Sequence, residues 1–276
     1  MNGQEDSGGM LTSESKRPRV ALKRAGEGPT YVLLHGGMGS WNHWARNIDV
    51  LARHFHIHAV DLPGYGASPD VDKAMSGEDY RGLVCRAVGE MLDGDEPFHL
   101  TGFSFGAALS SCVAAYFGER VKGMSLIGSS GYGKPEGGRS VNTRSYKSAG
   151  DDEKMYREIV RENLLAFMLS DPETVDDDAV DFHGDNVRRT RFDSRKISWG
   201  DTQRTDLAKI TCPLQLIWGS SDVTAYPSIE DRVALCRERV PGLRIDVIPG
   251  AAHWAMYDSA DAVNELLLDF HRGLAD

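Results

Sequence analysis

Short apolar runs of strand length alternate with segments whose apolar residues recur at helical spacing, and this alternation constrains the fold most. The strand-like runs occupy residues 19–24, 30–35, 55–60, 97–101, 121–127, 213–218 and 243–248. Helical periodicity marks residues 40–51, 80–92, 105–117, 228–240 and 259–270. This order predicts an α/β fold with a mostly parallel central sheet and helices on both faces.

The alternation is interrupted once, by residues 131–205. This block is polar and charged and contains the helical stretch MYREIVRENLLAFML and the acidic stretch DPETVDDDAVDFH. We expect it to be a helical cap inserted into a core made of residues 19–130 and 206–276. An insertion there would lie at the carboxyl ends of the strands, where open α/β sheets bind ligands. Residues 1–18 are polar, lack the apolar core of a secretory signal and are expected to be a disordered tail.

Charge and composition exclude several classes of partner. The net charge of −10 argues against nucleic acid, whose phosphates require a basic face. No run of eighteen apolar residues is present, so no membrane span is expected. The cysteines are far apart and lack zinc-site spacing, which favours a reducing cytoplasm. They are Cys85, Cys112, Cys212 and Cys236.

The stretch HLTGFSFGAALS places Ser104 between two aromatic residues, with Gly102 and Gly106 just outside them. It follows a predicted strand and opens a predicted helix, which is the context of a nucleophile elbow. At such a turn the serine adopts a strained backbone that exposes its hydroxyl. Ser104 is therefore the candidate nucleophile, although a glycine-rich turn alone could carry the same pattern.

A nucleophilic serine needs a base and an acid that orients the base. Asp222 lies in WGSSDVTAYP after the penultimate strand, and His253 lies in IPGAAHWAMYD after the last strand. Both loops begin at carboxyl ends of strands, so the two side chains can converge on Ser104. The order Ser, Asp, His matches a known catalytic triad on this topology.

The stretch HGGMGS, residues 35–40, follows an early strand and predicts an oxyanion hole. Its glycines let backbone amides approach a developing negative charge. We assign the amides of Gly37 and Phe105 to this role. A phosphate cradle is the alternative, but the stretch lacks both the Lys-Ser/Thr ending and GxGxxG spacing.

Together these stretches resemble the α/β-hydrolase fold superfamily. LLHGGMGSW, DLPGYGAS, GFSFGA, WGSSD and GAAHW stand in that family's order and spacing. The resemblance covers nearly the whole chain except the tail and the middle block, which corresponds to the family's cap domain. It implies acyl transfer through a Ser-His-Asp triad that requires no cofactor.

HGGMGSWNHW and HWAMYDSADAVNELLLDF are also similar to the meta-cleavage-product hydrolases, which cleave a carbon–carbon bond. The resemblance implies that Trp254 lines the pocket and that a cap arginine binds a substrate carboxylate. Arg188 is the matched arginine, with neighbouring Arg189 and Arg191 as rivals. Phe103 stands where that group usually carries asparagine. Further candidate substrate-binding residues are Met38 and Trp199.

Several functions stay open at this point. We expect a serine hydrolase that cleaves a carboxylic ester or related acyl bond of a small apolar molecule. Carbon–carbon bond hydrolysis is an alternative, as is a cofactor-free peroxidase-like side activity. A non-catalytic receptor for a small ligand is an alternative of another class. Dehalogenases and epoxide hydrolases of this fold need a carboxylate nucleophile, which the serine at position 104 disfavours.

Two clusters of metal-binding residue types have simpler explanations. His54, His56 and His58 alternate along a predicted strand, but no carboxylate or further ligand has suitable spacing. The acidic run 176–178 lacks the glycine and distal glutamate of a calcium loop and is better explained as a solvated helix face. No metal site is expected. The expected partner is a small-molecule substrate, and a homodimer is left open.

Overall fold

The computed structural model describes residues 20–92, 94–135 and 141–274. The tail expected over residues 1–18 lies outside the described residues. Seven strands form one sheet in the order β1-β3-β2-β4-β5-β6-β7. Only β1 runs antiparallel to its neighbour, β3, and every other neighbouring pair is parallel. The strands are β1 Leu22–Ala25, β2 Thr30–Leu34, β3 His56–Val60, β4 Phe98–Phe103, β5 Val121–Ile127, β6 Leu214–Gly219 and β7 Arg244–Ile248.

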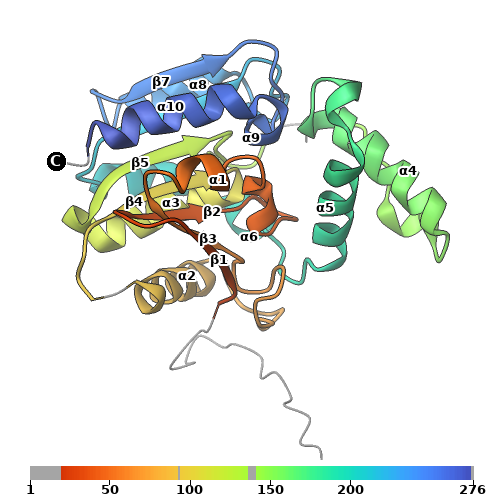
Figure 1. Ribbon diagram of the computed structural model, residues 1–276, viewed down its shortest axis with the longest axis horizontal. Helices are drawn as coiled ribbons and strands as arrows, with labels where there is room; N and C mark the ends of the chain where they lie inside the picture. Colours follow the sequence, from red (N-terminus) through yellow and green to blue (C-terminus); the bar gives the residue numbers. More distant parts are fainter. Residues whose placement is uncertain (1–19, 93, 136–140, 275–276) are drawn as a thin grey trace, which may run out of the picture.

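Helices cover both faces of this sheet, as the alternation predicts (Figure 1). They are α1 Ile48–Leu51, α2 Gly77–Met91, α3 Phe105–Phe117, α8 Ile229–Arg237, α9 Ala255–Asp258 and α10 Ala260–Arg272. Successive side chains of a strand point to opposite faces. Val32 and Leu34 of β2 accordingly join the core cluster that includes α2 and α3, whereas Tyr31 and Leu33 join the cluster that includes α10. The sheet is therefore buried on both sides, and the predicted fold class is confirmed.

The prediction of a single helix over residues 40–51 is wrong. The chain forms a 3-10 turn, η1 Trp41–Trp44, and then the short helix α1. The amides of Ala45 and Asn47 bond the carbonyls three residues earlier, at 3.1 and 2.9 Å, so the first turn is wound too tightly to continue as an α-helix. Ser40 is the N-cap of η1, as its position predicts, and accepts a hydrogen bond from the amide of Asn42 at 3.4 Å.

The segment between β5 and β6 contains helices and no strand in its described part. Its α-helices are α4 Glu153–Asn163, α5 Asp177–Arg188, α6 Arg195–Ser198 and α7 Thr202–Asp206. Short turns join or extend them: η3 Tyr146–Ala149, the π-turn η4 Leu164–Met168, η5 Pro172–Thr174 and η6 Leu207–Lys209. Figure 1 shows α4 and α5 (green) side by side, extending away from the sheet.

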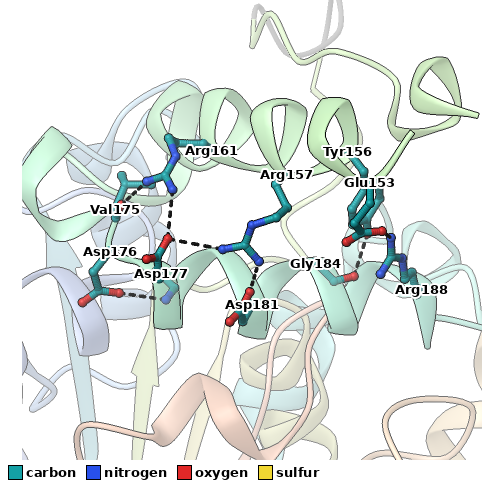
Figure 2. A network of polar contacts seen from close by, with 11 residues as sticks. Glu153, Tyr156, Arg157, Arg161, Val175, Asp176, Asp177, Asp181, Gly184 and Arg188 are labelled. Carbon is teal, nitrogen blue, oxygen red and sulfur yellow. Dashed lines mark hydrogen bonds and ion pairs between the residues drawn. The ribbon is translucent and has the colours of Figure 1, made fainter. Parts of the chain in front are cut away.

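Charged pairs join α4 to α5, as Figure 2 shows. Asp177 lies 3.3 Å from Arg157 and 3.2 Å from Arg161, and Arg157 also pairs with Asp181. The acidic run of the sequence thus begins a helix whose carboxylates face arginines of α4.

Within the described ranges, no helix is long and apolar enough to cross a membrane.

Candidate active site

Ser104 occupies the sharp turn between β4 and α3. Its φ of 52° and ψ of −111° lie in a region that non-glycine residues rarely adopt. Gly102 and Gly106 make the turn possible because their surroundings leave no room for a side chain. A Cβ on Gly106 would lie 2.4 Å from the carbonyl oxygen of Leu34, and one on Gly102 would lie 2.3 Å from Oγ of Ser110. The elbow predicted from GFSFG is therefore present.

His253 lies in the loop between β7 and α9, and its Nε2 is 3.0 Å from Oγ of Ser104. The segment between β5 and β6 holds this loop in place. The backbone amides of His253 and Trp254 donate to the carbonyls of Phe167 and Met168, at 3.3 and 2.8 Å. The imidazole is 4 % exposed, so it meets Ser104 in a largely water-excluded environment.

Asp222 follows β6, and its Oδ2 lies 2.8 Å from Nδ1 of His253. The backbone amide of Thr224 donates to the other carboxylate oxygen at 2.8 Å. Burial acts to raise the pKa of Asp222, but the charge of His253 and hydrogen bonds from His253 and Thr224 outweigh it, so the pKa lies below its usual value. The carboxylate is thus ionised and can hold a proton on Nδ1 of the imidazole.

Thr224 is a member of this cluster that sequence analysis missed. Its Oγ1 lies 3.0 Å from Nδ1 of His253, and the residue is 8 % exposed. Its position two residues after Asp222 favours a hydrogen bond from its backbone N–H to that carboxylate, as in an Asx turn. The contact of its hydroxyl with a histidine from another loop depends on tertiary packing, which no local pattern signals.

The amides assigned to the oxyanion hole lie beside Ser104. Gly37 and Phe105 line the same cavity as the Ser104 side chain. Phe105 is the first residue of α3, where amides have no partner within the helix and the helix dipole favours negative charge. In the described part of the chain, no hydrogen bond uses the amide hydrogen of either residue. Both amides are thus free to donate, and their assignment to an oxyanion stays a prediction.

The cavity at Ser104 has a volume of about 110 Å³. Its apolar walls come from Met38, Phe103, Phe105, Phe167 and Met168, and its polar walls from His183, Ser194, Arg195 and Ser198, with Trp199 beside them. A second cavity of about 210 Å³ shares Met38 and Phe167 with it and is otherwise lined by Val141, Thr143 and Tyr146. The space next to Ser104 is therefore small, with walls that are in part apolar and in part polar.

Met38 and Trp199 lie in the cavity wall, as expected of substrate-binding residues, but Trp254 does not. Trp254 is 0 % exposed, and its indole N–H donates to the carbonyl of His43 at 2.9 Å. Its ring packs on Tyr257 with centroids 4.4 Å apart. The structure therefore does not place Trp254 in the cavity wall, contrary to what the resemblance implies, because the residue is part of the hydrophobic core.

Arg188 is also absent from the lining of the cavity, and Figure 2 shows it beside Glu153. Its guanidinium is 2.5 Å from Glu153 and stacks over the ring of Tyr156 at 3.9 Å. His183 of the same helix does line the cavity. Side chains five residues apart on an α-helix point in directions about 140° apart, so His183 and Arg188 cannot both face Ser104. The structure therefore does not place Arg188 at the cavity, contrary to what the resemblance implies, and its rival Arg191 donates to the carbonyl of Ser68 at 2.5 Å.

Among the described residues, no group of three or more histidine, cysteine, aspartate or glutamate side chains is placed to hold a metal ion. His58 is buried on β3, and its ring packs edge-on against that of His56 with centroids 4.5 Å apart. His56 and His58 are thus packed on the strand, whereas His54 lies in the turn before it and is exposed.

Comparisons with known proteins bear on the fold and the family. A model of the alpha/beta hydrolase family matches residues 31–266. A 2-hydroxy-6-oxononadienedioate/2-hydroxy-6-oxononatrienedioate hydrolase of Comamonas testosteroni is 28 % identical over 275 residues, covering 91 % of each chain. A meta-cleavage product hydrolase from Pseudomonas fluorescens IP01 superposes with a TM-score of 0.71 at 20 % identity, covering 92 % of this chain and 94 % of that one. A thermophilic esterase from Thermogutta terrifontis gives a TM-score of 0.67 at 18 % identity, covering 93 % and 94 %. At such identities the two structures show a shared fold.

Proposed function

Because the chain belongs to the alpha/beta hydrolase family, we propose that it hydrolyses a carboxylic ester or related acyl bond through Ser104, His253 and Asp222. The observation that carries the proposal is the continuous pair of contacts from Oγ of Ser104 to Nε2 of His253, at 3.0 Å, and from Nδ1 of His253 to Asp222, at 2.8 Å. A hydroxyl, an imidazole and a carboxylate in this order form a catalytic triad.

Each member has a distinct role in the proposed reaction. His253 removes the proton of Ser104 as Oγ attacks the substrate carbonyl. Asp222 fixes the imidazole tautomer and stabilises the imidazolium that forms. The amides of Gly37 and Phe105 bind the oxyanion, and losing one such donor typically costs about 3 kcal/mol. His253 then gives its proton to the leaving group and activates a water that releases the acid. Apart from the substrate and one water, these steps use groups of the chain alone.

The small volume of the cavity at Ser104 and the apolar surface of the adjoining cavity support a substrate that is small and apolar. A space of about 110 Å³ beside Ser104 leaves room for only a short chain, and the adjoining cavity offers apolar surface from Val141, Tyr146 and Phe167. The proposed cap, residues 131–205, supplies much of both walls. Substrate of this shape would place its scissile carbonyl at Ser104 and its larger apolar part in the second cavity.

Charge in the cavity favours a neutral substrate. Arg195 is the arginine in the cavity wall, and its guanidinium is already held by Asp193 through two contacts of 2.8 Å. This two-pronged bond occupies part of the N–H donors of the guanidinium and offsets its positive charge, which weakens its attraction for a substrate carboxylate. Among the described residues that line this cavity, Arg195 is the sole lysine or arginine, so an uncharged ester fits it better than an anionic acid.

A panel of 4-nitrophenyl esters with increasing acyl length tests the proposal. We expect the ratio kcat/KM to be highest for the shortest acyl groups and to fall as the chain outgrows the cavity. The absence of turnover for every ester, by protein whose circular dichroism shows a folded chain, would contradict an esterase function.

Carbon–carbon bond hydrolysis is a second candidate, favoured by one observation. The Comamonas testosteroni relative, similar over 91 % of this chain, is named a 2-hydroxy-6-oxononadienedioate/2-hydroxy-6-oxononatrienedioate hydrolase. That reaction adds a ketonisation step before Ser104 attacks. The test is spectrophotometric loss of a 2-hydroxy-6-oxo-hexa-2,4-dienoate chromophore. Turnover of this compound at a higher kcat/KM than any ester would replace the ester proposal, while both proposals share Ser104.

A further inference from the structure

Two cysteines of neighbouring helices lie in contact outside the cavity at Ser104. Sγ of Cys85, on α2, is 3.7 Å from Sγ of Cys112, on α3. Both are free thiols, and they come from chain positions 27 residues apart. Cys85 is buried, whereas Cys112 is half-buried and so within reach of a small solute. Nothing in the proposed hydrolysis uses either sulfur.

A cation lies beside this pair. Arg81 precedes Cys85 by one helical turn, so both side chains emerge on one face of α2. The contact with the Cys85 thiol and the charge of Arg81 lower the pKa of Cys112, even though burial and Asp206 act against them. The contact with Cys112 and burial raise the pKa of Cys85. Ionisation is therefore favoured at Cys112, which is also the more exposed of the two sulfurs.

Two carboxylates hold the Arg81 side chain in place beside the thiols. Arg81 is bonded to both carboxylate oxygens of Asp206 at 2.6 Å and to Glu78 at 2.7 Å, yet its Nε is buried with no hydrogen-bond partner among the described residues. The guanidinium is thus fixed in place by the two carboxylates while one of its donors stays unused. A fixed cation next to a thiol is the setting in which cysteines react with oxidants.

We propose that Cys85 and Cys112 are a dithiol modification site that a peroxide converts to an intramolecular disulfide. The Cys112 thiolate attacks one peroxide oxygen and breaks the O–O bond, which yields a sulfenic acid and, after protonation, one water. The Cys85 thiol then attacks the Cys112 sulfur, loses its proton and expels the second water. Two thiols are oxidised by two electrons, and one hydrogen peroxide is reduced to two waters. The new bond joins α2 to α3, the helix that begins next to Ser104.

The other two cysteines are matched controls within the same chain. Cys212 and Cys236 are buried, and burial raises the pKa of each to about 11. Cys236 contacts the hydroxyl of Tyr132 at 3.3 Å, and neither thiol contacts another sulfur in the described part of the structure. General oxidation of the protein would consume these thiols too, whereas a specific site would spare them.

The test treats the full-length reduced protein with hydrogen peroxide, alkylates remaining thiols in denaturant and maps the peptides by mass spectrometry. We expect the peptides of Cys85 and Cys112 to be joined by a disulfide while Cys212 and Cys236 are alkylated. Cys112→Ser should slow oxidation of Cys85 by more than about tenfold, because the ionised sulfur is gone. Cys85→Ser should instead leave Cys112 as a sulfenic acid that dimedone traps.

Three outcomes would overturn the proposal. They are full alkylation of Cys85 and Cys112 after peroxide, equal loss of all four thiols, and disulfides formed only between separate molecules. Circular dichroism of each variant establishes that it is folded before oxidation. Ester turnover plays no part in the readout, so this test stands whether or not the proposed hydrolysis is correct.

Discussion

The hydroxyl of Thr224 lies 3.0 Å from Nδ1 of His253, the same ring nitrogen that faces Asp222 at 2.8 Å. The backbone amide of Thr224 also donates to the second oxygen of that carboxylate. One residue therefore contacts both the proposed base and the acid that orients it. We infer that Thr224 is a positioning residue, which helps fix the imidazole so that Nε2 faces Ser104.

Replacing Thr224 with valine tests this inference, since valine keeps the branched shape and removes the hydroxyl. A hydrogen bond to a charged group contributes roughly 1.5 kcal/mol, so we expect kcat to fall about tenfold with little change in KM. Thr224→Ser keeps the hydroxyl and should retain most activity. Wild-type kcat in the valine variant would show that the contact is structural only.

Asp222→Asn should lower kcat far more, because the amide favours the wrong imidazole tautomer. In a serine protease the corresponding change reduces kcat by about 10⁴-fold, and we expect a loss of that order in ester hydrolysis. Initial rates at a saturating ester concentration measure this loss of kcat. A loss of only about tenfold would show that Asp222 does not orient the base.

The lowered pKa of Asp222 predicts that the stability of the fold depends on pH. The native pKa of Asp222 is lowered, so the native state favours the carboxylate. Its stabilisation is fully present above the unfolded pKa of about 3.9 and is lost as pH falls through the lower native pKa. The difference in melting temperature between wild type and Asp222→Asn should therefore become smaller as the pH is lowered from about 6 to about 3. A difference that stays constant over this range would contradict the lowered pKa.

Gly106→Ala should destabilise the fold, because the new Cβ would lie 2.4 Å from two backbone carbonyl oxygens. Overpacking of this kind typically costs about 1–3 kcal/mol in the free energy of unfolding. Gly82→Ala is the control, since the nearest atom to its Cβ would be the end of the Arg86 side chain at 3.5 Å. Alanine there should stabilise α2 by about 0.5–1 kcal/mol. Urea unfolding of both variants checks the opposite signs, and equal signs would contradict the packing described for the elbow.

Arg188→Ala should leave kcat/KM for esters within about twofold of wild type, as for most surface substitutions. Its pair with Glu153 is half exposed, at 48 % and 63 % for the two side chains, so we expect a stability loss of about 1 kcal/mol or less. Kinetics on esters and on a carboxylated dienoate measure the effect. A selective loss on the dienoate would restore Arg188 as a carboxylate-binding residue.

Much of the fold could be predicted because it depends on local patterns. Parallel strands buried on both faces read as continuous apolar runs, so β2, with the sequence TYVLL, lies within the residues expected of it. The long helix α3 also matches, since Gly118 ends it with a φ of 55°. The prediction failed over residues 40–51, where apolar spacing resembles a helix but the chain forms tighter turns.

Only part of the candidate site could likewise be predicted from the sequence. Ser104, Asp222 and His253 could be brought together from sequence because each follows a strand of one parallel sheet, whose carboxyl ends meet at one edge. The side chains of the segment between β5 and β6 could not be placed, because the rotation of α5 decides whether His183 or Arg188 faces Ser104. That rotation is set by packing against α4, where the pairs of Arg157 with Asp177 and Asp181 lie.

Labelling with a fluorophosphonate tests the central claim most directly, since this probe reacts with a serine hydroxyl activated by a neighbouring base. We predict that the wild-type protein is labelled on the peptide containing Ser104, and that Ser104→Ala, with an unchanged melting temperature, loses both labelling and ester turnover. Turnover by folded Ser104→Ala at the wild-type rate, or labelling at another serine with Ser104 unmodified, would contradict the account.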